Sequence, residues 1–169
     1  MSETLSGAQR LRLEFDQGYA LAPPSAQGLG EDLLGVGLGG EPYALRVAEI
    51  ARLAAGSNLA ALPTAAVASL GLVGLRGELL PVWDLGALLG YAPLRSRPKW
   101  LASSATLPRW AAGFERFDGY LKAPLADLSP YAGGGPAEGL AVQLCSTGGV
   151  LRPVLSFEKL LQAIRHLEA

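Results

Sequence analysis

The chain has 169 residues and a formal net charge of −1, with 50% hydrophobic and 17% charged residues. This length suits one domain, or two small lobes sharing a core. The sequence lacks the dense Lys/Arg cluster that nucleic-acid binding usually requires. The single cysteine, Cys145, excludes an internal disulfide, which is compatible with the reducing cytoplasm. Because it lies in an apolar stretch, its thiol is predicted to be buried. The low charge predicts an apolar, docking-prone surface, although a genome biased toward Ala, Leu and Gly explains it equally well.

Residues 1–30 differ in pattern from the rest and are interpreted as an N-terminal extension to a domain of residues 31–169. Leu11, Leu13 and Phe15 alternate with charged residues, which favours a strand, although a short helix is also compatible. Prolines 23 and 24 and the small residues after them indicate a loop or linker. The extension could cover an open groove or bind a partner. Residues 1–12 lack an apolar stretch of signal-peptide length.

An uncharged stretch from Leu53 to Leu75 is long enough to cross a bilayer. Asn58 and Pro63 interrupt it and are poorly suited to a lipid-facing helix. We therefore expect no insertion into a membrane.

Two strand-like hairpins follow the extension. Residues 34–38 and 43–47 alternate apolar and other residues around a Gly-Gly-Glu-Pro turn. Apolar runs at 70–75 and 78–83 flank a turn at Arg76-Gly77. Asp84 is a good N-cap for a two-turn helix ending at Gly90.

The second half continues in short strands. Residues 100–103 and 110–122 predict strands, and the Pro- and Gly-rich residues 124–139 predict a loop. Residues 140–144 and 150–155 predict a strand pair. A final helix is expected over 157–167 with Ser156 as its N-cap.

An internal repeat relates two of these units. Residues 77–89 align without gaps on residues 149–161, and both copies place Pro-Val before an N-cap and a Leu-Leu pair. The repeat predicts two similar lobes, and the many short strands predict small barrels. Features common to both copies, among them Gly77 and Pro81, are interpreted as structural. The residue equivalent to Arg76 in the second copy is Gly148, so the turn does not require an arginine. Two interpretations of Arg76 remain open: a planar cation that binds a partner's carboxylate, or a solvated turn residue.

One segment resembles the signature hairpin of CheW-like domains. It reads Gly71-Leu-Val-Gly-Leu-Arg-Gly-Glu-Leu-Leu-Pro-Val-Trp-Asp-Leu85, against a family pattern of Gly-x-x-x-Leu-Arg-Gly-x-x-x-Pro-x-x-Asp-Leu. Tyr43-Ala-Leu-Arg-Val-Ala-Glu-Ile50 resembles the family's second strand, and Leu62-Pro63 the dipeptide before the hairpin. The resemblance covers about residues 32–165.

The resemblance implies a mainly β fold of two SH3-like five-stranded barrels packed together with short helices. It implies a non-catalytic, cytoplasmic adaptor without cofactor or metal. Its expected partners are a chemoreceptor's cytoplasmic tip, the regulatory domain of a CheA-type histidine kinase, and other CheW-like proteins. The family's partner-binding positions fall on Val47, Glu49, Gly71 and Arg76. Each also has a structural explanation: Val47 as core, Glu49 as a solvated residue and Gly71 as a backbone requirement.

An enzyme is the main alternative to an adaptor. Catalysis is disfavoured because the single histidine, His166, lies near the end of a Leu-rich helix, and no nucleophile elbow or phosphate-binding loop is present. Asp84 and Asp118 could pair as carboxylates, but Asp84 is explained as a cap. A stand-alone module binding one partner, as a kinase antagonist, an array cap or a regulator of pili or gliding, remains an alternative. A structural SH3-like protein outside chemosensing is another.

Overall fold

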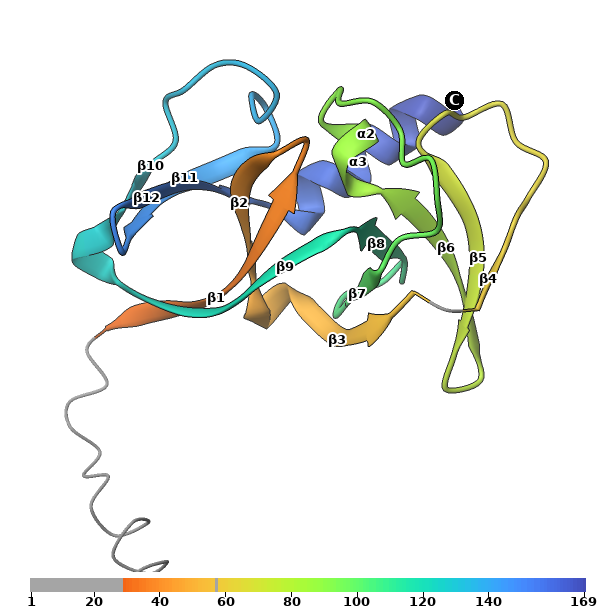
Figure 1. Ribbon diagram of the computed structural model, residues 1–169, viewed down its shortest axis with the longest axis horizontal. Helices are drawn as coiled ribbons and strands as arrows, with labels where there is room; N and C mark the ends of the chain where they lie inside the picture. Colours follow the sequence, from red (N-terminus) through yellow and green to blue (C-terminus); the bar gives the residue numbers. More distant parts are fainter. Residues whose placement is uncertain (1–28, 57) are drawn as a thin grey trace, which may run out of the picture.

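A computed structural model describes residues 29–56 and 58–169, and in them the chain is mainly β (Figure 1). The strands are β1 (Gly30–Leu38), β2 (Glu41–Arg46), β3 (Ile50–Ala55), β4 (Leu59–Ala60), β5 (Ser69–Leu75), β6 (Glu78–Asp84), β7 (Trp100–Ser104), β8 (Ala111–Phe114), β9 (Arg116–Pro124), β10 (Leu128–Pro130), β11 (Ala141–Thr147) and β12 (Val150–Leu155). The helical segments are η1 (Val47–Glu49), α2 (Leu85–Leu88), η2 (Leu125–Asp127) and α3 (Phe157–Glu168). The N-terminal extension lies outside the described residues, except for its last two.

The strands form two curled sheets that lie side by side, with α2 and α3 along one side of their junction (Figure 1). The first sheet has the order β10-β11-β12-β2-β1-β9, and the second the order β4-β5-β6-β8-β7-β3. The expected pair of barrel-like lobes is therefore confirmed. Each sheet has six strands rather than five, because a strand of two or three residues, β4 or β10, extends one edge.

The repeat extends well beyond the segment that identifies it in the sequence. The hairpins β5–β6 and β11–β12 share the same register: Leu72 pairs with Pro81 as Leu144 pairs with Pro153. The equivalent valines, Val82 and Val154, both pair in parallel with a further strand, β8 in one sheet and β2 in the other. The two sheets thus have equivalent strand orders and share the register of these pairs.

Three apolar clusters explain why the lobes form one body. Each sheet encloses a small cluster of its own, around Leu33 and Cys145 in the first and around Val73 and Leu80 in the second. The largest cluster lies between the sheets and includes Leu34, Trp83 and Leu160. The burial of Cys145 is confirmed. Because the main core belongs to both lobes, we expect them to unfold together.

A pair of tyrosines adds a polar link across the junction. Tyr43 on β2 and Tyr91 after α2 have hydroxyl oxygens 2.7 Å apart. Burial, and then this hydrogen bond, raises the pKa of the Tyr43 hydroxyl above its usual value. Tyr43 therefore stays protonated at physiological pH and can keep sharing the bond.

Most expected elements are present, with two corrections. The helix after Asp84 has four residues rather than two turns ending at Gly90. It ends early because the backbone N–H groups of Leu89 and Tyr91 both donate hydrogen bonds to the Gly86 carbonyl. The region 124–139 is not only loop, since it contains η2 and β10. In the part of the chain described, the uncharged stretch contributes to β3, β4 and β5, and no helix is both long and apolar enough to cross a membrane.

Candidate docking surfaces

The β5–β6 hairpin projects from the second sheet (Figure 1) and carries an apolar outer face. Because side chains alternate along a strand, Val73, Leu80 and Val82 point into the lobe. The opposite face of the hairpin carries Leu72, Gly74, Leu79 and Pro81. Leu79 is 68% exposed, although an apolar side chain of this size is stabilised by burial. We call these four residues and Arg76 the hairpin surface.

Arg76 is at the tip of this hairpin in an unfavourable backbone conformation. Its φ is 48°, and among the described residues it is the one non-glycine with a positive φ. Gly77 follows with φ 81°, so the turn has the two left-handed residues that tight hairpins prefer. The equivalent turn uses Gly148 and Gly149, with φ 61° and 76°. The turn therefore tolerates Arg76 but gains nothing from it, since a left-handed L-residue costs about 1–2 kcal/mol.

The Arg76 guanidinium makes no hydrogen bond or ion pair with any side chain in the described ranges, and Arg76 is exposed. A neighbouring ion pair holds the hairpin instead: Arg109 Nη1 lies 2.6 Å from Glu78 Oε2. Arg76 is therefore available as a donor to a partner while another pair steadies the strand beside it.

Gly71 has a backbone role. It is buried with φ 121°, where β5 bulges against β6, and a Cβ there would collide with the Ala60 carbonyl of β4. Replacing Gly71 with alanine should lower the free energy of unfolding by about 1.5 kcal/mol, through strain and displacement of β4. Thermal unfolding would test this, with Gly74→Ala as a control, because a Cβ at Gly74 meets open space. Equal stability of the two variants would contradict the steric role.

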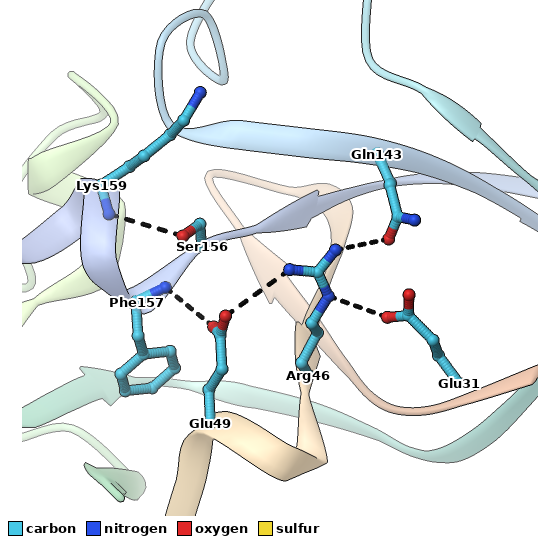
Figure 2. Close-up of polar contacts among 7 residues, drawn as sticks. All are labelled: Glu31, Arg46, Glu49, Gln143, Ser156, Phe157 and Lys159. Atoms are coloured by element: carbon cyan, nitrogen blue, oxygen red, sulfur yellow. Dashed lines mark hydrogen bonds and ion pairs between the residues drawn. The ribbon is translucent and has the colours of Figure 1, made fainter. Parts of the chain in front are cut away.

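Glu49 is engaged within the molecule (Figure 2). Its Oε2 accepts a hydrogen bond of 2.9 Å from the backbone N–H of Phe157, the first residue of α3. Its Oε1 lies 3.6 Å from Arg46 Nη1. A carboxylate at a helix N-terminus is favourable because the free N–H groups there carry partial positive charge. Glu49 therefore ties η1, in the chain between the two sheets, to the start of α3.

Arg46 is the centre of this group, although the sequence pattern did not single it out. Besides the ion pair with Glu49, it donates hydrogen bonds to Glu31 Oε2 at 2.8 Å and to Gln143 Oε1 at 2.7 Å (Figure 2). We call Glu31, Arg46, Glu49 and Gln143 the Arg46 network. It joins β1, β2 and η1, which are close together in the chain, to the distant strand β11. In the sequence, Arg46 resembles any polar residue at the end of an alternating strand.

Val47 lies beside this network on a second surface. It is half-buried and lines two shallow pockets, one with Gly30 and Asp32 and one with Leu53 and Tyr120. The four predicted binding residues therefore form two groups. Gly71 and Arg76 share the hairpin, whereas Val47 and Glu49 share η1.

The residues considered for catalysis are held in structural contacts. Asp84 is buried, and its two oxygens accept from Ala87 N and Leu94 N. Asp118 pairs with Arg116 at 2.9 Å and Arg152 at 3.3 Å. His166 Nδ1 lies 2.7 Å from the Gln162 carbonyl on an exposed turn of α3. Within residues 29–56 and 58–169, no three His, Cys, Asp or Glu side chains gather as metal ligands.

Comparison with known proteins agrees with this architecture. The CheW-like domain model matches residues 32–165. No curated protein matches the chain. The solved structure of the scaffolding protein TtCheW from Thermoanaerobacter tengcongensis has a TM-score of 0.70 and 14% identity, covering 78% of this chain and 92% of that one. Proteins of this family are non-catalytic scaffolds in chemotaxis. With a family model matched over most of its length and the same pair of barrel-like sheets, the chain belongs to the CheW-like domain family.

Proposed function

We propose that this protein is a non-catalytic cytoplasmic adaptor that couples a chemoreceptor to a CheA-type histidine kinase. An adaptor needs two surfaces that can be occupied together. The hairpin surface and the surface around Val47 lie on different elements, β5–β6 and the η1–β3 segment, which supports binding of two partners.

The conformation of Arg76 carries this proposal. A residue kept in a left-handed turn, where the equivalent turn has glycine, needs a reason outside the turn itself. Its guanidinium, which no described side chain binds, can pair with a carboxylate in a planar, bidentate geometry. The apolar face beside it, with Leu79 exposed, can exclude water around that pair, as at the centre of many interfaces.

Replacing Arg76 with asparagine should separate binding from stability. Asparagine adopts the left-handed conformation readily, so the free energy of unfolding should rise by about 0.5–1 kcal/mol. Affinity for one partner should fall by about 2 kcal/mol, roughly 30-fold. Calorimetry with the receptor tip and with the kinase regulatory domain from the source organism, beside thermal unfolding, measures both quantities.

Arg95→Asn is the matched control, because Arg95 is also exposed but lies in the loop after α2. It should leave both affinities unchanged. If Arg76→Asn lowers stability, or leaves both affinities intact, the assigned role of the hairpin surface is wrong.

The alternative is a module that binds one partner and caps an array or antagonises the kinase. Co-purification from the source organism separates the two functions. An adaptor retains receptor and kinase in one complex, whereas a cap retains only one of them.

A further inference from the structure

Beside β3, apolar side chains at the margin of the core between the two sheets are partly exposed to solvent. Ile50 and Leu53 on β3 pack against this core, and Val47 and Tyr120 lie next to them in one shallow pocket. Tyr120 is 69% exposed and stacks edge-on against Phe117, with ring centroids 5.6 Å apart. We call Val47, Ile50, Ala51, Leu53 and Tyr120 the seam. Arg52 lines the same pocket. An exposed aromatic group beside partly buried aliphatic side chains indicates a surface that another segment covers.

Both strands beside the seam have an open edge. In the described part of the chain, β3 pairs only with β7, and β9 pairs only with β1. Their other edges carry backbone N–H and C=O groups that an added strand can bind. The seam therefore offers apolar side chains and strand-pairing groups together.

The chain enters the described structure at the end of this seam. Gly30, Glu31 and Asp32 line a pocket whose wall also includes Val47. The Leu29 carbonyl is bonded to the N–H of Leu125, which fixes the start of β1. Leu29 and Gly30, where the described chain begins, therefore lie near the Val47 end of the seam.

We propose that residues 11–15 of the same chain bind along the seam and pair with one of its open strand edges. Leu11, Leu13 and Phe15 alternate with charged residues, so one face of an extended segment would meet Tyr120 and Leu53 while the other meets water. The link from Phe15 to Gly30 can span at most about 50 Å, which is enough to turn back along β3 or β9. No second molecule is needed, because the tether supplies a high local concentration.

This contact makes the extension a built-in competitor for the seam. A partner that uses Val47 would first have to displace residues 11–15, so its apparent affinity would be lowered. That consequence rests on the proposed adaptor function, whereas the contact within the chain does not.

Disulfide trapping in the full chain tests the contact directly. In a Cys145→Ser background, Leu13→Cys is combined with Ala51→Cys, which lies in the seam. The matched control combines Leu13→Cys with Val67→Cys, a 75% exposed site in the loop after β4, away from the seam. Under mild oxidation, non-reducing electrophoresis should show the intramolecular Ala51 bond forming at least about tenfold faster than the control bond. Equal rates, or bonds only between molecules, would overturn the proposal.

A measurement without cysteines guards against misfolding of those variants. Leu11, Leu13 and Phe15 are changed together to aspartate, with Leu5, Tyr19 and Leu21 changed to aspartate as the control. Amide exchange of β3 or of β9 should speed up about tenfold in the first variant only, since the open edge loses its cover. Unchanged exchange at both strands would refute the contact. Neither experiment needs a partner, so both succeed or fail independently of the adaptor function.

Discussion

Replacing Asp84 with alanine should lower the free energy of unfolding by about 3 kcal/mol. The carboxylate accepts two backbone hydrogen bonds, 3.1 Å from Ala87 N at the start of α2 and 2.7 Å from Leu94 N in the following loop. The side chain is only 1% exposed, so water cannot easily replace it, and each abandoned N–H costs about 1–3 kcal/mol. For a chain of this size the melting temperature should fall by about 6–12 °C.

Two controls separate the cap from the loop contact. Asp84→Asn keeps one acceptor for Ala87 but turns an NH₂ group or a weaker acceptor toward Leu94, so about half the loss is expected. Among the described residues, the side chain of Ser156, the equivalent residue in the repeat, makes only the cap bond, with its Oγ 3.5 Å from Lys159 N. Ser156→Ala should therefore cost about 1 kcal/mol. Equal losses for Asp84→Ala and Ser156→Ala would show that the bond to Leu94 contributes little.

Replacing Glu49 with alanine should cost about 2.5 kcal/mol of unfolding free energy. The change removes a charged acceptor from the N-terminus of α3 and leaves the Phe157 N–H without its partner. It also removes the nearest anion from one nitrogen of Arg46, although Glu31 and Gln143 still bind that guanidinium. Chemical denaturation, with the slope checked against the wild type, measures this loss.

Glu49→Gln distinguishes structure from recognition. The amide oxygen can still accept from Phe157, so stability should recover to within about 1 kcal/mol of the wild type. If Glu49→Gln folds normally and still loses a partner, the charge itself takes part in binding. If only Glu49→Ala loses the partner, the effect comes from a displaced α3 and η1.

The sequence by itself determined the local units of this fold. Both hairpin turns, the two N-caps and the repeat could be predicted, because each depends on residues close together in the chain. Asp84 shows the limit of such reasoning. Its role as an N-cap followed from its position before the helix. Its hydrogen bond with the Leu94 N–H instead depends on the path of the loop after α2, which brings Leu94 back to Asp84.

Tertiary structure decided which residues act together. Arg46 contacts Glu31, Glu49 and Gln143, and Gln143 is 97 positions away in the chain. No local sequence pattern predicts such a long-range contact. The same holds for the seam, whose Tyr120 and Leu53 come from different sheets. Residues from distant strands meet only when the two lobes close over a common core, because that burial sets the geometry between them.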